Sequence, residues 1–513
     1  MLVKTFAAAL QGISATIITI EVNCTKGIQF FLVGLPDVAV RESHERILSA
    51  LQEFKYKIPR SRIVINMAPA NIRKEGSAYD LPLAIGILAG TEQIKADKLE
   101  QYMLMGELSL DGTLNPIKGV LPIAIKAREE GFKGFILPKQ NAREAAVVNN
   151  LEVYGVSTIK EVIDFMDGKK ELEQTYVNTR EEFYAKQQQF DFDFSEVRGQ
   201  ENVKRALEVA AAGGHNIIMI GPPGSGKSML AKRLPGILPP FTLHESLETT
   251  KIHSVAGKIG SDTSLMTQRP FRSPHHTISD VAMVGGGSYP QPGEISLAHN
   301  GILFLDELPE FNRNVLEVMR QPLEDRLITI SRARFTVEYP AGFMLVASMN
   351  PCPCGYYNNH PTKQCVCSPG AVQKYMNKIS GPLLDRIDIQ IEIVPVPFEK
   401  ISERADAEPS SKIRERVMAA RAIQAKRFEP HPGIYCNAQM NSRLLHQYAI
   451  PNPQGLEILK KAMTKLNLSA RAYDRILKVS RTIADLAGSE EIESCHIAEA
   501  IHYRNLDRES WGI

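Results

Sequence analysis

A short segment of this sequence has the spacing of a loop that binds phosphate. It fits the pattern G-x-x-x-x-G-K-[ST] and consists of Gly221, Pro222, Pro223, Gly224, Ser225, Gly226, Lys227 and Ser228. Glycines let backbone N–H groups surround phosphate oxygens, and a helix beginning near Lys227 would favour their negative charge. We expect Lys227 to contact the outer phosphates of a nucleotide and Ser228 to ligate Mg²⁺. A turn that fits the pattern by chance is the alternative, and the apolar run Ile217–Ile220 directly before the loop argues against it.

A second segment supplies the acidic residues that hydrolysis would need. The apolar run Ile302–Leu305 is followed directly by Asp306 and Glu307. We expect Asp306 to orient Mg²⁺ through its water shell and Glu307 to polarise the attacking water. A buried strand that merely ends in two acids is the alternative, which the phosphate-binding loop in the same chain disfavours. The two segments together predict ATP hydrolysis.

Three further polar residues are candidates for sensing or completing this site. Asn350 comes just after a third strand-like run, Phe343–Ser348, and would contact the terminal phosphate, although an ordinary turn residue before Pro351 is the alternative. Arg386 precedes a strand-like segment and would reach the γ-phosphate of a neighbouring subunit, unless it only pairs with Asp385 or Asp388. Arg471 opens a helix and would sense phosphate from the lid, unless it is an ordinary helical arginine. If both arginines have these roles, the sites lie between subunits of a ring.

Four of the seven cysteines fall close together, and they are Cys352, Cys354, Cys365 and Cys367. Four thiolates can enclose a tetrahedral Zn²⁺ and hold a loop together. Each C-x-C pair is tighter than the usual C-x-x-C spacing, so reduced thiols in a turn and a disulfide are alternatives. Because the cluster directly follows Asn350, a bound ion would be structural and would lie near the nucleotide or the pore.

The elements that position these residues suggest an α/β chain of three domains. Residues 1–167 alternate strand-like and helix-like segments, residues 168–193 form a polar linker, and residues 194–394 hold short apolar strands between helices. Short apolar runs of this kind suit a parallel sheet covered on both faces. Residues 395–513 are helical throughout and would form a lid over the nucleotide.

Composition is that of an ordinary globular protein and narrows the function little. The net charge is only +2, so any surface that binds nucleic acid must be local. No segment approaches the roughly 18 apolar residues of a membrane span, so no membrane partner is expected. Seven cysteines in a chain of 513 residues do not indicate a disulfide scaffold, and we expect a cytoplasmic protein.

Several segments resemble the magnesium-chelatase-like AAA+ ATPases, and these are Arg269–Thr277, Pro292–Gly301 and Leu305–Phe311. The resemblance covers nearly the whole chain, including Gly34–Val40 and Asn66–Asn71, and is strongest to bacterial competence-associated members. It implies a homohexameric helicase that promotes DNA branch migration while transforming DNA is integrated by homologous recombination, with recombination proteins as further partners. A chelatase-type ATPase that remodels a separate protein partner is the alternative, although no adhesion-type partner domain is encoded.

Two regions are candidates for contacting DNA. Arg332 and Arg334 lie at the tip of an expected hairpin, which matches the pre-sensor hairpin of related helicases. Six copies would line a pore with at least twelve positive charges and bind DNA independently of sequence, in a salt-dependent way. A solvated hairpin tip is the alternative. The insert Phe241–Asn300 would project a second loop toward the pore, in which His275 and His276 are either pore residues or simple loop histidines.

The first domain resembles the Lon-protease and ribosomal-S5-like fold, on the segments Lys74–Asp80 and Gly106–Gly119. Lon-type cleavage needs a serine nucleophile and a lysine base. The resemblance places Ala78 and Leu121 at those positions, while Ser77 and Lys118 are out of register. We therefore expect no proteolysis, and a role for this domain in DNA contact or ring assembly.

Overall fold

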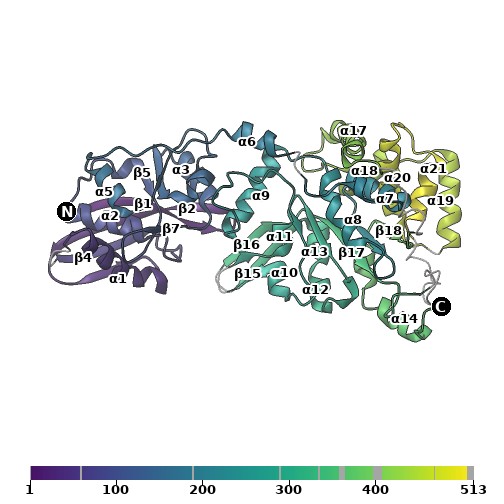
Figure 1. Cartoon of the computed structure of the whole chain (residues 1–513), viewed down its shortest axis with the longest axis horizontal. Helices are drawn as coiled ribbons and strands as arrows, with labels where there is room; N and C mark the ends of the chain where they lie inside the picture. The colour runs from purple at the N-terminus through teal and green to yellow at the C-terminus, as the bar shows by residue number, and fades with distance from the viewer. Residues whose placement is uncertain are drawn as a thin grey trace.

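The computed structural model describes residues 2–57, 61–187, 190–287, 290–332, 335–357, 364–396, 407–466 and 468–504. The molecule is elongated, with an N-terminal α/β unit at one end, a second α/β unit in the middle and a helical unit at the other end (Figure 1). Among the described helices, none is long and apolar enough to cross a membrane.

The N-terminal unit is built on a seven-stranded mixed sheet with the order β3-β4-β2-β1-β5-β8-β9. The strands are β1 (Leu2–Gln11), β2 (Ser14–Lys26), β3 (Phe30–Val33), β4 (Ser61–Ala68), β5 (Tyr102–Leu104), β8 (Gly134–Pro138) and β9 (Glu152–Val156). The helices that accompany it are α1 (Val38–Glu53), α2 (Asp80–Gly90), α3 (Val120–Glu129), α4 (Ala142–Ala145) and α5 (Ile159–Met166). A short ribbon of β6 (Glu107–Leu108) and β7 (Leu114–Asn115) completes the unit.

This unit begins with a long antiparallel hairpin of β1 and β2. Gly12 turns the chain at φ +62°, a conformation that glycine adopts without strain. The apolar helix α2 is buried along its whole length. It lies against the hairpin so closely that a Cβ on Gly86 would meet Val22 at 2.8 Å. The hydrophobic core of the unit therefore lies between this sheet and its helices.

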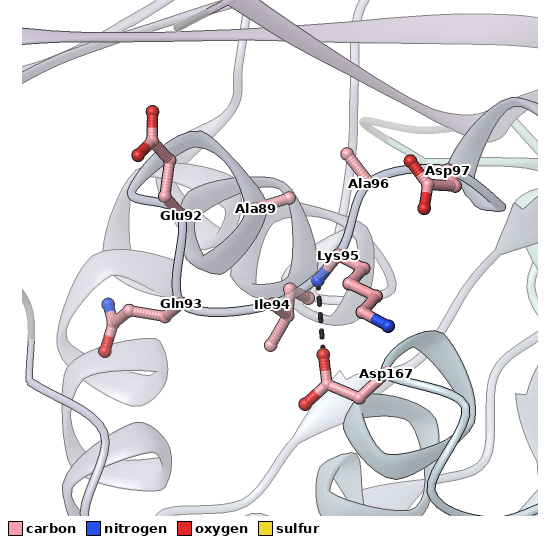
Figure 2. Close-up of a pocket in the computed structure, with 8 residues that line it drawn as sticks. All are labelled: Ala89, Glu92, Gln93, Ile94, Lys95, Ala96, Asp97 and Asp167. Carbon is pink, nitrogen blue, oxygen red and sulfur yellow. Dashed lines mark hydrogen bonds between the residues drawn. The ribbon is translucent and has the colours of Figure 1, made fainter.

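Residues between the two α/β units are mostly irregular and contain α6 (Thr179–Lys186). This segment is packed on its neighbours, since Phe183 is buried and Glu182 pairs with Arg143 at 2.6 Å. A pocket lies in the N-terminal unit, between the loop after α2 and Asp167, whose carboxylate accepts a 3.1 Å hydrogen bond from the Lys95 backbone N–H (Figure 2). None of the residues predicted to bind nucleotide or metal lines that pocket.

The central unit holds a five-stranded parallel sheet with the order β11-β14-β17-β10-β18. The strands are β10 (Ile217–Ile220), β11 (Phe271–Arg272), β14 (Ile302–Leu305), β17 (Met344–Met349) and β18 (Ile389–Glu392). The three central strands are fully buried because helices cover both faces of the sheet. Their carboxyl ends meet at one edge, and β17 lies between β10 and β14.

Helices and short ribbons surround this sheet. The helices are α7 (Glu201–Gly213), α8 (Lys227–Arg233), α9 (Leu243–Val255), α10 (Asp280–Val284), α11 (Glu294–Leu297), α12 (Arg313–Val318), α13 (Arg320–Asp325), α14 (Pro369–Met376) and α15 (Gly381–Leu384). The ribbons pair β12 (Gly285–Gly286) with β13 (Gln291–Pro292) and β15 (Leu327–Arg332) with β16 (Phe335–Pro340).

The C-terminal unit consists of α17 (Ser410–Phe428), α18 (Ser442–Tyr448), α19 (Pro453–Lys465), α20 (Ala470–Leu486) and α21 (Ser494–His502). Its apolar residues share one core with the outer face of the central sheet, so it is a helical cap on that sheet. A buried polar cluster joins the two, because His215 hydrogen-bonds both Asp388 at 3.1 Å and Thr482 of α20 at 2.8 Å. The expected combination of an α/β chain and a C-terminal helical lid is confirmed.

The N-terminal unit contacts the insert Phe241–Asn300 of the central unit. Helix α3 packs on α9, and the Gly119 backbone N–H donates to the Ser254 carbonyl at 3.0 Å. Ile13, at the tip of the first hairpin, packs on the core beside β15 and β16. The N-terminal unit thus touches the hairpin that was predicted to contact DNA.

Candidate nucleotide-binding site

The phosphate-binding loop lies where its chemistry requires. Strand β10 ends at Ile220, and helix α8 begins at Lys227, as the sequence predicted. Gly224 and Gly226 have φ values of +77° and +88°, so glycine is needed at both positions. The start of α8 presents its unpaired backbone N–H groups to the loop.

Lys227 is folded back onto the loop. Its Nζ donates hydrogen bonds to the carbonyl oxygens of Gly221 at 2.7 Å and Pro222 at 2.9 Å, and to Oδ1 of Asn350 at 3.2 Å. Desolvation lowers the pKa of Lys227, while the charges of Asp306 and Glu307 oppose that shift. A bound phosphate would replace the carbonyl acceptors and restore the stability of the ammonium form.

Asp306, which directly follows the apolar strand β14, lies beside Ser228. The Ser228 hydroxyl donates to Oδ2 of Asp306 at 2.7 Å, and the Ser348 hydroxyl of β17 donates to Oδ1. Glu307 is exposed, has φ +54°, and its backbone N–H donates to the Ser348 hydroxyl at 3.3 Å. Ser348 therefore orients the Asp306 carboxylate and holds the Glu307 backbone.

These oxygens fit a magnesium ion. Mg²⁺ prefers hard oxygen ligands and usually keeps waters beside one or two protein ligands and the substrate phosphates. Ser228 and Asp306 present a hydroxyl and a carboxylate next to the loop, and they would hold the ion there. Its charge would offset that of the phosphates, and Glu307 would orient water at the open side.

Arg386, predicted to act on a neighbouring subunit, and Arg471, predicted to sense phosphate from the lid, both pair with side chains outside the phosphate-binding loop. The Arg386 guanidinium donates to the carbonyl oxygen of Arg320 at 3.0 Å and pairs with Glu324 at 2.6 Å. Arg471 is largely exposed and pairs with Asp385 at 3.2 Å. The sequence offered Asp385 and Asp388 as partners for Arg386, but the carboxylates of these two pair with Arg471 and Arg475 instead. A contact of Arg386 with a neighbouring subunit stays a prediction.

Two residues of this site were missed by sequence reasoning. Ser348 lies in β17, two positions before Asn350, which directly follows the strand, so strand periodicity was the available signal. The Gln200 amide donates to the carbonyl oxygens of Ser225 and Val394, each at 3.2 Å, and joins the loop to the segment after β18. No sequence pattern indicated that bridge.

The four clustered cysteines come together next to this site. Their sulfur atoms all lie within 4.8 Å of one another, and Cys352 is 3.3 Å from Cys354 and 3.7 Å from Cys365. Desolvation raises the pKa of Cys354, but hydrogen bonds from the backbone N–H groups of Tyr356 and Val366 outweigh it and lower that pKa to about 6. All four thiols are unbridged, so the cluster could hold a metal ion.

The residues predicted to contact DNA are only partly described. The expected hairpin is present as β15 and β16, with Arg332 at the end of β15, and Arg334 lies outside the described residues. In the insert, the centroids of the His275 and His276 rings lie 4.1 Å apart with the rings tilted, and the centroid of the His276 ring lies 6.4 Å from that of Phe311. Arg272 forms a two-pronged pair with Glu294, so this arginine of the insert is structural.

The protease-like positions of the N-terminal unit carry no nucleophile. Ala78 offers a methyl group, and Leu121 is buried. The Leu121 backbone N–H donates to Glu144 at 3.0 Å. Ser77 instead hydrogen-bonds the Glu107 carboxylate, and the Lys118 chain lies over Gly257. These contacts are structural ones.

In the central sheet, β17 lies between β10, which leads into the phosphate-binding loop, and β14, which leads into Asp306 and Glu307. A parallel sheet with this additional strand defines an AAA+-type P-loop ATPase. The magnesium chelatase subunit ChlI model matches residues 193–401, its C-terminal model matches 407–504, and the ChlI subunit model of the same enzyme matches 20–141. Competence protein ComM of Haemophilus influenzae is 43% identical over 98% of this chain and 97% of its own length. YifB of Escherichia coli is 43% identical over 98% of the chain and 96% of its own length.

Two more distant relatives match parts of the chain. Lon protease 2 of Bacillus subtilis is 31% identical over 24% of the chain and 22% of its own length. The magnesium-chelatase 38 kDa subunit of Cereibacter sphaeroides is 24% identical over 31% of the chain and 53% of its own length. The chain belongs to the ComM/YifB family of magnesium-chelatase-like AAA+ ATPases.

Proposed function

We propose that this ATPase is a DNA motor, a homohexameric helicase or translocase that promotes branch migration during integration of transforming DNA. The observation that carries the proposal is the near full-length likeness to a protein named for competence. The hairpin of β15 and β16, with Arg332 at the end of β15, supports the proposal because an arginine there could contact the DNA backbone. The motor works in the cytoplasm with ATP and Mg²⁺, beside recombination proteins.

The proposed cycle uses the site described above. Lys227 moves from the loop carbonyls to the phosphates, and Asn350, which is hydrogen-bonded to Lys227, contacts the terminal phosphate. Glu307 orients the attacking water, and Arg386 of a neighbouring subunit stabilises the charge of the transferred phosphoryl group. Arg471 reports the state of the nucleotide to the helical lid.

DNA would be held by charge alone. Arg332 and Arg334 from each of six subunits would contact phosphates, so binding would be independent of sequence and would weaken steeply with salt. Changing both arginines to alanine should reduce DNA-stimulated ATP hydrolysis and should lower the slope of binding against salt. The charge-matched control is Arg128→Ala with Arg443→Ala, since both of these side chains are exposed and lie away from the hairpin.

The test is branch migration of a synthetic three-strand junction, with ATP hydrolysis measured alone and with single-stranded or forked DNA. We expect ATP-dependent strand exchange and stimulated hydrolysis in the intact chain and in the control. The proposal would be refuted if the rate of ATP hydrolysis were the same with and without each DNA structure and no strand exchange occurred.

A chelatase-type ATPase that remodels a protein partner is the second candidate. The likeness to the magnesium-chelatase 38 kDa subunit favours it. Hydrolysis stimulated by a co-purified protein, and unchanged by DNA, would support this candidate over the DNA motor.

We also propose that the four cysteines hold a structural Zn²⁺. A tetrahedral zinc with bonds of about 2.3 Å places its sulfur ligands about 3.8 Å apart. The sulfur pairs at 3.3, 3.5 and 3.7 Å are close to that spacing. They are far from the S–S distance of about 2.05 Å in a disulfide. Metal analysis of the intact chain tests this, with one zinc per chain expected and none refuting it.

A further inference from the structure

The cysteine cluster lies against the nucleotide site and is continuous with it in the chain. Asn350, which contacts Lys227, is two residues before Cys352. Cys352 is fully buried at this point. The chain therefore passes from a phosphate-sensing residue directly into the cluster.

The turn that carries the first two cysteines packs on the phosphate-binding loop. Gly355 has φ +86°, and a Cβ built on it would lie 2.6 Å from Cδ of Pro223. The Gly355 backbone N–H closes the turn by donating to the Cys352 carbonyl at 3.0 Å. This turn is therefore in van der Waals contact with the loop that must surround phosphates.

The second pair of cysteines leads into a helix that returns to Asn350. Helix α14 starts at Pro369, directly after Cys367 and its capping residue Ser368. Tyr375, in the last turn of this helix, is buried and hydrogen-bonds the backbone of Asn350. The cysteine cluster therefore closes a segment that begins at Asn350 and ends at Tyr375, whose side chain contacts the Asn350 backbone.

We propose that a metal ion on the four cysteines clamps Asn350 and Pro223 in place, so that occupancy of the metal site sets nucleotide affinity. This rests on the proposed zinc site and does not depend on DNA being the substrate. Without the ion, four thiols hold the turn only by weak contacts, and the turn would move away from Pro223. Asn350 would then lose its contact with Lys227, and the phosphate-binding loop would lose its packing against the turn of Gly355.

The first test is reversible and uses the intact chain. A chelator removes the ion, and binding of a fluorescent ATP analogue is titrated before removal, after removal and after zinc is added back. We expect affinity to fall about tenfold, the effect of losing about 1.4 kcal/mol of binding energy, and to return with zinc. An affinity that is unchanged while zinc is lost would overturn the clamp and leave the zinc site standing.

Substitutions distinguish the effect of the metal ion from the effect of the packing of Gly355 on Pro223. Cys365→Ser should lose zinc and lower nucleotide affinity, whereas Cys24→Ser and Cys495→Ser, which change cysteines outside the cluster, should do neither. Gly355→Ala should keep zinc but lower affinity, because its methyl group would displace Pro223. Gly433→Ala is the matched control, since Gly433 has a similar φ of +85° and a Cβ there meets nothing within 4 Å.

The outcomes are distinct. Normal nucleotide affinity in both Cys365→Ser and Gly355→Ala overturns the clamp. Absence of zinc from the intact chain overturns the metal site and the clamp together. Failure of DNA to stimulate hydrolysis affects neither, because no readout here involves DNA.

Discussion

Lys227 and Lys74 are both buried lysines whose ammonium groups bond to backbone carbonyl oxygens. Lys227 donates to Gly221 and Pro222 in the phosphate-binding loop. Lys74 is inaccessible to solvent and donates to Gly34 and Pro69 in the N-terminal unit. Desolvation lowers the pKa of both, in the case of Lys74 to about 8.

What surrounds each lysine distinguishes them. Lys227 starts a helix after a loop of glycines, and the carboxylates of Asp306 and Glu307 are near enough to raise its pKa against desolvation. Lys74 bridges two loops, and its backbone also pairs with the segment of Leu35 and Asp37. A buried lysine is therefore not a site by itself, and its neighbours decide whether it can release its acceptors for a ligand.

The largest effect is expected for Lys227→Ala. The variant removes the only side chain in the loop that can carry positive charge to the outer phosphates. We predict that ATP turnover falls on the order of a thousandfold, as when a preorganised charge-stabilising donor is lost. Steady-state phosphate release measures this, and turnover within a few fold of the intact chain would refute the role.

The second effect is expected for Glu307→Gln. The amide keeps the size of the side chain but cannot accept the proton of the attacking water, so turnover should fall about a hundredfold or more. ATP binding should remain, because Glu307 is exposed and does not bond the loop. Phosphate release and analogue binding are measured on one preparation. Loss of binding would show that Glu307 holds the nucleotide instead.

A smaller effect, on stability alone, is expected for Lys74→Met. The carbonyl oxygens of Gly34 and Pro69 would each lose a hydrogen bond from a charged donor, which costs about 1–3 kcal/mol in total. Denaturant unfolding measures the loss, and nucleotide affinity is the control. Lys461→Ala, on an exposed side chain, should change stability by less than about 0.5 kcal/mol. If Lys74→Met instead reduced nucleotide binding, the contrast between the two lysines would fail.

A further effect on stability is its dependence on pH. Because the pKa of Lys74 is lowered from 10.5 to about 8, the folded chain binds fewer protons than the unfolded chain between those pH values. The cost of burying the charge is full below pH 8 and is relieved as pH rises toward 10.5, so this group makes stability rise with pH. Unfolding curves across that window should lose this contribution in Lys74→Met, and identical pH profiles would contradict it.

The nucleotide site was largely predictable because its parts are local in sequence. Strands β10 and β14 have the predicted bounds, and the loop and acids directly follow them. β17 begins one residue later than expected, at Met344. The strand predicted at Ile13–Val22 corresponds to β2, and β1 was not predicted separately because its alanines obscure its alternation.

The parts that sequence could not predict depend on distant residues meeting. Ser348 contacts Asp306 across 42 positions of the chain, and Arg471 contacts Asp385 across 86. Such pairs form only when the sheet order and the position of the lid are known. The cysteines were predicted to be near the nucleotide because they follow Asn350, but the contact of Gly355 with Pro223 carried no sequence signal.

The most direct test is equilibrium titration of Mg²⁺-ATP into the intact chain, Lys227→Ala and Lys74→Met, under conditions in which all three are folded. We predict that Lys227→Ala shows no saturable binding, while Lys74→Met binds with the affinity of the intact chain. Equal affinities in all three, or loss of binding in Lys74→Met alone, would contradict the assignment of the nucleotide site to Lys227 and its loop.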